Sequence, residues 1–147
     1  GMNELAEILL VEDNPDELEL SISALKESNF ANPINVARDG EEALDFLFAR
    51  GAFTERAGRP TPKVILLDLK LPKIDGIEVL RQIRANPATR TIPVVVLTSS
   101  QQERDLVATY DLGANSYIVK PVDIDKFIEA ICAIGMYWTM LNERPQS

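Results

Sequence analysis

Four short apolar runs, each followed at once by polar residues, constrain the fold of this chain more than any other feature. The run at 64–67 consists of Val, Ile and Leu and stops at Asp68. Continuous apolar runs of this length are typical of strands that are buried on both faces of a parallel sheet. The other three runs, at 8–11, 94–97 and 117–119, are followed by Glu12-Asp13, by Thr98 and by Lys120.

These polar strand ends predict a functional site. In open α/β sheets, ligands bind in the crevice beyond the carboxyl ends of the strands. A single acid in such a place is more often a helix cap or a solvated loop residue, and Thr98 or Lys120 alone would be a cap or a surface charge. Independent caps would not be expected to supply three acids, a hydroxyl and an ammonium group at one edge. We therefore expect these side chains to converge.

Between the apolar runs, the sequence carries the 3.6-residue periodicity of helices, as alternating α/β folds require. Short polar residues that cap helices precede two of these segments, at Asn14 and at Asp39. The stretch 51–62 has no period and contains two glycines and two prolines, so we expect a loop there. Three further helices are expected over about 77–86, 102–112 and 123–142.

Composition indicates one domain of an ordinary cytoplasmic protein. The chain has 147 residues and 23 acids against 15 bases, with a net charge of −8. Such a charge disfavours nucleic-acid binding, and no run of about 20 apolar residues offers a membrane span. The only cysteine, Cys132, cannot form an internal disulfide, which suits a reducing compartment. We expect a single domain over 1–147, with its core at about 6–129 and no output domain.

The chain contains no histidine. It therefore cannot be a histidine kinase, a histidine phosphotransfer domain or a Ser-His-Asp hydrolase, and a metal site in it cannot use imidazole. A site built from carboxylates favours a hard cation such as Mg²⁺ over zinc.

The polar strand ends, together with the segments that follow them, resemble the receiver domain of two-component response regulators over nearly the whole chain. The segments that carry this resemblance are Glu12-Asp13, Asp68, 71–76, Thr98-Ser99 and 112–121. The stretches 66–73 and 92–98, with the long connection before the third strand, are similar to the small single-domain regulators that partner phytochromes. The resemblance implies a doubly wound α/β fold, with a five-stranded parallel sheet in the order 2-1-3-4-5 and five helices.

The same resemblance implies roles for the strand-end residues. Asp68 would accept a phosphoryl group, which three clustered acids would repel without a cation such as Mg²⁺ or Mn²⁺. The remaining phosphoryl contacts and the switch would involve Thr98, Lys120 and Tyr117, and a cis peptide bond would precede Pro121. The metal ligands would be Asp13 and Asp68 directly, Glu12 through water and the backbone carbonyl of Lys70.

Two residues depart from the usual receiver pattern. Ser99 follows the switch hydroxyl where receivers usually have Ala or Gly, and it is still small enough to admit a phosphoryl group. Lys70, two residues after the acceptor, is a long cation near the site entrance. Its side chain would either shield the phosphoryl group from water or remain solvated.

Three functions from different classes fit these residues. The leading one is an interaction switch that a histidine kinase, such as a bacteriophytochrome, phosphorylates. Its variant is a relay intermediate that passes the group to a histidine phosphotransfer protein. The second is an aspartyl-phosphate phosphatase, but such enzymes commonly carry a further acid two residues after the nucleophile, where this chain has Lys70. The third is a phosphorylation-independent scaffold, which the intact set of site residues disfavours.

The C-terminal segment predicts a partner. No charged residue occurs from Ala130 to Asn142. On one continuous helix, a first apolar stripe would face the core. A second apolar stripe, nearly opposite the first, would then be exposed to water unless a partner protein packs against it. A second copy of the chain is the simplest such partner. The cognate kinase is the alternative partner. The core stripe contains Phe127, Ile131, Ile134, Trp138 and Leu141, and the interface stripe contains Ile128, Cys132, Met136 and Met140.

Overall fold

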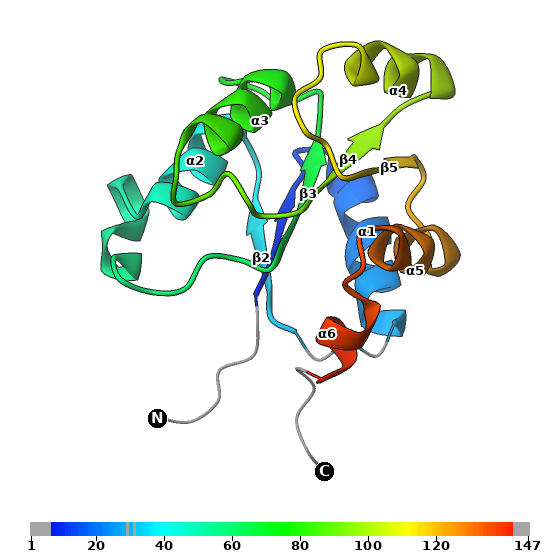
Figure 1. Ribbon diagram of the computed structural model, residues 1–147, viewed down its shortest axis with the longest axis horizontal. Helices are drawn as coiled ribbons and strands as arrows, with labels where there is room; N and C mark the ends of the chain where they lie inside the picture. The colour runs from blue at the N-terminus through cyan, green and yellow to red at the C-terminus, as the bar shows by residue number, and fades with distance from the viewer. Residues whose placement is uncertain (1–6, 29, 31, 143–147) are drawn as a thin grey trace.

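A five-stranded parallel sheet forms the centre of the molecule (Figure 1). The computed structural model describes residues 7–28, 30 and 32–142, without the side chains of residues 141 and 142. The strand order is β2-β1-β3-β4-β5, so the expected doubly wound topology is confirmed. The strands are β1 (Ile8–Val11), β2 (Ile34–Ala37), β3 (Val64–Asp68), β4 (Val94–Thr98) and β5 (Ser116–Val119).

Helices connect the strands and cover both faces of the sheet. Within the described residues there are six α-helices and one 3-10 helix, where the sequence predicted five helices. In chain order they are α1 (Pro15–Glu27), α2 (Gly40–Phe48), η1 (Gly51–Arg56), α3 (Gly76–Ala85), α4 (Gln101–Ala108), α5 (Ile124–Ala133) and α6 (Tyr137–Asn142).

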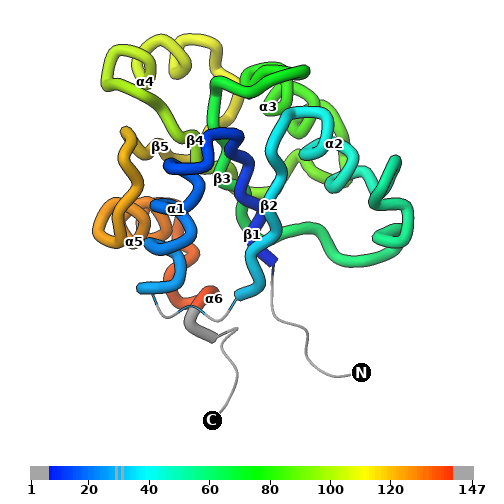
Figure 2. The backbone as a smooth tube through the Cα atoms, turned by 180° about the vertical axis from the view of Figure 1, so that it is seen from behind, coloured from blue at the N-terminus to red at the C-terminus, as the bar shows by residue number. Residues whose placement is uncertain are grey.

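The side chains of each buried strand alternate between two hydrophobic clusters, because successive residues point to opposite faces of a sheet. Leu9 and Leu67 pack with α2, α3 and α4 on one face, whereas Leu10 and Leu66 pack with α1, α5 and α6 on the other. Figure 2 shows the same layers from behind, with α1 and α5 on the opposite side of the sheet from α2 and α3. Strands β1, β3 and β4 are buried along their whole length, as parallel strands covered on both faces should be.

Short polar side chains set where the helices begin. Asn14 accepts hydrogen bonds from the backbone amides of Asp16 and Glu17, and Asp39 accepts one from Glu42 at 2.7 Å. These contacts satisfy amides that have no partner inside the helix. Asp75, Ser100 and Asp123 cap α3, α4 and α5 in the same way. Helix α4 ends at Ala108, so the expected extension of this helix to Leu112 is wrong.

The segment that was expected to be an unstructured loop contains helix η1, and this corrects the sequence prediction for 51–62. Two aromatic contacts explain why it is ordered. The ring of Phe53 packs edge-on against Phe46 of α2, with centroids 5.4 Å apart, and the guanidinium of Arg56 lies 3.7 Å from the Phe46 ring. The segment therefore gains packing that periodicity does not reveal.

The C-terminal segment also differs from the prediction, because it forms two helices instead of one. The chain turns at Gly135, whose φ of 73° lies in the left-handed region that glycine tolerates. This turn rotates α6 relative to α5, so the two expected stripes do not persist. Trp138, expected in the core, is 72% exposed, and Met140, expected in an interface, is completely buried. Leu141 lies outside the described side chains.

Among the helices of the described residues, none is both long and apolar enough to cross a membrane.

Candidate functional site

Parallel pairing brings the carboxyl ends of the strands to one edge. Val11 pairs with Leu67, so Glu12 follows β1 beside Asp68, the last residue of β3. Thr98, the last residue of β4, pairs with Val119 of β5. The backbone amide of Lys120 then donates to the carbonyl of Thr98 at 2.8 Å. The register alone therefore places an acid, a hydroxyl and an ammonium group on neighbouring strands.

Glycine keeps the start of α3 close to this edge. The amide of Gly76 donates to the carbonyl of Leu69 at 2.9 Å. A Cβ atom at Gly76 would lie 2.4 Å from the carbonyl oxygen of Asp68, closer than such atoms approach in proteins. A larger residue there would push the loop after β3 away from the acceptor carboxylate.

Lys120 lies at the centre of three carboxylates. Its Nζ is 3.1 Å from Oε1 of Glu12 and 3.0 Å from Oδ2 of Asp68, and it also donates to Glu17. The lysine side chain is 12% exposed, while Glu12 and Asp68 are buried. This compact ion cluster is the main electrostatic feature of the sheet edge.

Glu17 belongs to the cluster although the sequence analysis did not select it. It lies in the first turn of α1, three residues after the Asn14 cap, and the helix direction carries its side chain over the strand ends. In the sequence it resembles an ordinary acid placed to suit the helix dipole. Its spacing from Asn14 places it in the first turn after β1, but this does not distinguish it from an ordinary first-turn acid.

Asp13 is exposed, whereas its neighbour Glu12 is buried. The three carboxylates whose oxygen atoms lie within 4.8 Å of one another are Glu12, Glu17 and Asp68. Asp13 therefore lies at the rim of the site, adjacent in sequence to Glu12 but outside the cluster.

Burial and the neighbouring acid shift the protonation of Glu12. Burial, together with the hydrogen bond and negative charge of Asp68, raises the pKa of Glu12 to about 8, against a smaller lowering by Lys120. Burial lowers the pKa of Lys120, but hydrogen bonds to Glu17 and Asp68 and the adjacent negative charges raise it above its usual value on balance. The lysine therefore stays charged, and the acids hold more negative charge than it neutralises.

Thr98, the last residue of β4, lies at the same edge. It is fully buried, and Oγ1 has no hydrogen-bond partner among the residues that the structure describes. Burying a hydroxyl without a hydrogen-bond partner lowers the stability of the fold by on the order of 1–3 kcal/mol. Such groups are therefore rare in proteins, and this one calls for a functional explanation.

Tyr117 lies one strand further along the sheet, half-buried on β5. The guanidinium of Arg104, from α4, lies 5.3 Å from the centroid of its ring. Burial raises the pKa of the Tyr117 hydroxyl, so this hydroxyl stays protonated at neutral pH. The ring of Tyr117 on β5 thus contacts α4 through Arg104.

The loop after β5 has a fixed shape. The peptide bond between Lys120 and Pro121 is cis. The ammonium of Lys126, at the start of α5, donates to the carbonyls of Val119 at 3.0 Å and Pro121 at 3.1 Å. These bonds hold the backbone on both sides of Lys120.

Lys70 points away from the acid cluster. Its Nζ lies 3.6 Å from Glu103 of α4 and its side chain is 73% exposed, while its backbone amide donates to Oδ1 of Asp68 at 3.3 Å. Glu103 also accepts two hydrogen bonds from Ser99, both at 3.0 Å. The pair therefore connects the loop after β3 with α4, although an exposed contact of this length contributes little stability.

The acid cluster fits a hard divalent cation. Glu12, Glu17 and Asp68 each offer an oxygen atom within 4.8 Å of the others, and oxygen ligands are what Mg²⁺ and Mn²⁺ prefer. The excess negative charge at the edge supports the same conclusion.

Comparison with known proteins assigns the class. The family profile of the response regulator receiver domain matches residues 8–132. The chain belongs to this family, and it is a receiver domain of two-component signal transduction with phytochrome-associated relatives.

Among relatives, the response regulator Rcp1 of Synechocystis is 41% identical over 131 residues, covering 89% of this chain and 87% of its own. A probable methanogenesis regulatory protein, FilR2 of Methanothrix harundinacea, is 42% identical over 138 residues, covering 94% and 86%.

Two solved structures show the same fold. The bacteriophytochrome response regulator RtBRR is 52% identical, with a TM-score of 0.90, covering 96% of this chain and 84% of its own. The Mn²⁺-bound form of Rcp1 is 40% identical, with a TM-score of 0.72, covering 90% and 94%.

Proposed function

We propose that Asp68 accepts a phosphoryl group from a histidine kinase or a histidine phosphotransfer protein, and that the chain then signals by changing its protein contacts. The observation that carries this proposal is the contact of buried Asp68 with Lys120, at 3.0 Å, at the sheet edge where β4 ends in the buried residue Thr98. In the transfer, a carboxylate oxygen of Asp68 forms a bond to phosphorus as the P–N bond of the donor histidine breaks. The imidazole of the donor is the leaving group.

The transferred group needs positive charge at this edge. Lys120 supplies one cation, and we propose that Mg²⁺ or Mn²⁺ supplies the second, held by Asp68 and Asp13, by Glu12 through water and by the backbone carbonyl of Lys70. When bound, the cation neutralises negative charge on the carboxylates and the phosphoryl oxygens. Glu17 competes for Lys120, so we expect it to release the lysine when a phosphoryl group arrives. The Mn²⁺-bound form of Rcp1 supports a divalent cation in this family.

The unpartnered hydroxyl of Thr98 supports a switch role. A phosphoryl group on Asp68 adds about two negative charges and strong acceptor oxygens, to which Thr98 can donate. Movement of Thr98 towards Asp68 leaves space beside Tyr117, whose ring faces Arg104 on α4. Reorientation of Tyr117 into this space would change the surface formed by α4, β5 and α5.

Phosphorylation by a small donor tests the acceptor. Incubation with acetyl phosphate should add one phosphoryl group, seen by intact mass spectrometry, only when Mg²⁺ or Mn²⁺ is present. The variant Asp68→Asn should remain unmodified because an amide is not a nucleophile here. Equal modification of Asp68→Asn would contradict the assignment.

Replacement of Thr98 separates phosphorylation from signalling. Thr98→Ala should accept the phosphoryl group, since Asp68 and Lys120 remain, yet lose the change at α4 and β5. Amide NMR spectra with and without acetyl phosphate measure this change, and Thr98→Ser, which keeps the hydroxyl, is the matched control. Full phosphorylation-dependent shifts around Tyr117 in Thr98→Ala would contradict the coupling.

The partners follow from the family. A receiver domain implies a histidine kinase, and the relatives named as bacteriophytochrome response regulators support a bacteriophytochrome as that kinase. Phosphotransfer profiling against the histidine kinases of the host identifies the partner. A role as relay intermediate is the alternative, which transfer from phosphorylated Asp68 to a histidine phosphotransfer protein would show.

We also propose that the chain forms a homodimer through α5 and α6, with the cognate kinase as the alternative partner for this surface. Ile128 and Met136 are half-buried and Cys132 is exposed, so they remain available after Met140 is assigned to the core. The exposed indole of Trp138 adds a large apolar group on α6. Exposed aromatic groups of this kind are typical of surfaces that a partner covers.

A further inference from the structure

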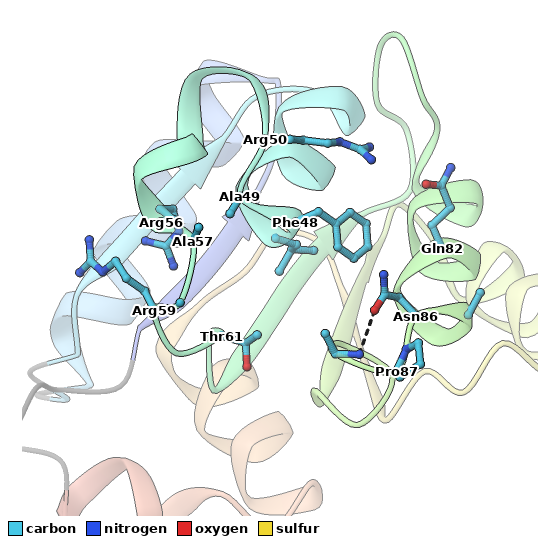
Figure 3. Close-up of a pocket in the computed structure, with 14 residues that line it drawn as sticks. Phe48, Ala49, Arg50, Arg56, Ala57, Arg59, Thr61, Gln82, Asn86 and Pro87 are labelled. Carbon is cyan, nitrogen blue, oxygen red and sulfur yellow. Dashed lines mark hydrogen bonds between the residues drawn. The ribbon is translucent and has the colours of Figure 1, made fainter.

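A groove of about 830 Å³ lies at the opposite end of the sheet from Asp68 (Figure 3). One wall is the connection that runs from η1 towards β3, and the other is the end of α3 with the turn after it. The end of α2 forms the floor, where the side chain of Phe48 lies between the two walls. Residues 47–50, 56–59, 61, 82 and 85–88 line it.

The wall formed by η1 is held in place by side-chain contacts. Arg56, whose side chain is only 10% exposed, lies 3.7 Å from the ring of Phe46 and 2.7 Å from a carboxylate oxygen of Glu7. Connections between a helix and a strand usually need about 2–6 residues, and long ordered ones are often functional. Residues 49–63 therefore build a preformed wall and not merely a link.

The charge of the groove is opposite to that of the molecule. Three arginines line it, Arg50, Arg56 and Arg59, and no acid is among the lining residues, in a chain with 23 acids and 15 bases. The side chains of Arg50 and Arg59 are 53% and 50% exposed. Arg50 contacts Asp45 through Nε at 2.9 Å, and Arg59 has a long contact of 3.6 Å to Glu7, which Arg56 already engages. Both guanidinium groups keep donors for an anion.

The floor adds an apolar component. Leu47 and Phe48 lie at the end of α2, and Ala85 and Pro87 lie across the groove on the α3 side. Ligand sites combine an apolar surface with a few polar groups that fix orientation, and their volumes are about 300–1,000 Å³. A purely polar ion would leave this floor exposed to water.

We propose that the groove docks an acidic segment of a partner protein, whose carboxylates contact Arg50 and Arg59 while an apolar side chain rests on Phe48. Charge complementarity favours an acidic segment over a second copy bound by apolar contact. The groove adjoins the amino ends of β3 and β4, whereas Asp68 and Thr98 lie at their carboxyl ends. A partner in the groove could thus stay bound while Asp68 is phosphorylated at the carboxyl ends of the strands (the phosphorylation edge). It would also leave free the surface of α5 and α6 that we propose for the dimer (the α5–α6 surface).

A defined peptide tests this docking site. A short fluorescein-labelled peptide of alternating glutamate and leucine should bind the full chain, measured by fluorescence anisotropy, and shift amide NMR signals within 47–61 and 82–88. The matched peptide of lysine and leucine should not bind. The double variant Arg50→Gln/Arg59→Gln should bind the acidic peptide at least about tenfold more weakly, because two charged contacts are lost.

A second double variant separates the groove from general electrostatics. Arg81→Gln/Arg90→Gln removes two exposed arginines that do not line the groove, so it should retain the affinity of the parent chain. Thermal unfolding of both double variants establishes that they are folded. The proposal would be overturned if the acidic peptide did not bind the parent chain, or if both double variants lost affinity for it equally. NMR shifts confined to residues outside the groove would also overturn it.

Discussion

At the residue scale, the acid cluster places carboxylates close enough to repel one another. Lys120 neutralises one of three carboxylates, and the pKa of Glu12 rises to about 8 because Glu12 is buried beside Asp68. Protonation of Glu12 relieves the repulsion when no cation is present, whereas a bound divalent cation would favour the ionised form.

This arrangement predicts a dependence of stability on pH. A pKa raised from 4.5 to about 8 means that folded Glu12 binds its proton more tightly than unfolded Glu12 does. The stability from this proton is fully present below pH 4.5 and is lost as the pH rises through about 8. Glu12→Gln should therefore flatten the loss of stability between pH 4.5 and about pH 8 in chelator-treated protein. The free energy of unfolding, measured by urea denaturation at each pH, tests this. The same dependence on pH in Glu12→Gln as in the parent chain would contradict it.

Several site residues could be predicted from the sequence, because each directly follows an apolar run whose strand character is clear. Asp68, Thr98 and Lys120 meet at the predicted edge. Glu17 could not be selected in this way, since its position depends on the angle at which α1 leaves β1. A single sequence does not fix this angle.

At the element scale, Arg84 joins parts of the chain that are far apart in sequence. All five of its N–H groups are used, in bonds from α3 to the carbonyls of Gly113, Arg90 and Ile92 and to Oδ1 of Asn115. Asn115 in turn accepts from the amide of Val94 at 2.8 Å. The guanidinium therefore anchors the starts of both β4 and β5.

Replacement of Arg84 should destabilise the fold. Arg84→Met should lower the free energy of unfolding by about 2 kcal/mol, because five hydrogen bonds from a charged donor are lost, one of them to the carbonyl of buried Ile92. Chemical denaturation measures this change. Arg81→Met is the matched control on the same helix, where the arginine is exposed and pairs with Glu78, so its effect should be below about 0.5 kcal/mol. Equal effects of the two substitutions would contradict the anchoring role.

The elements that the sequence predicted incorrectly have two different physical causes. Helix η1 depends on Phe46, Phe53 and Arg56, whose contacts join separate segments and leave no local period. The break between α5 and α6 had a local signal in Gly135, but the apolar stretch around it favoured one continuous helix. Strands were easier to predict because burial on both faces makes their sequence continuously apolar.

At the scale of the whole molecule, surfaces for different purposes lie apart. The phosphorylation edge, the α5–α6 surface and the groove beside η1 occupy separate parts of the fold. Under the proposals above, this separation would let the chain receive a phosphoryl group at one place and hold partners at others.

The proposed dimer gives a prediction at this scale. Trp138→Glu and Cys132→Glu place charge on exposed positions of α6 and α5, so each should give folded monomers where the parent chain is dimeric. Leu20→Glu, on the exposed face of α1, is the matched control and should stay dimeric. Light scattering at micromolar concentration measures the mass. A monomeric parent chain, phosphorylated or not, would reject the dimer.

The most direct test of the central claim locates the phosphoryl group on the chain. Borohydride reduces an aspartyl phosphate to homoserine, so treatment of the acetyl-phosphate-modified protein followed by peptide mass spectrometry marks the acceptor. We predict homoserine at position 68 and aspartate at position 13, in a sample prepared with Mg²⁺. Homoserine at any other acid, or unmodified Asp68 in a phosphorylated sample, would contradict the account.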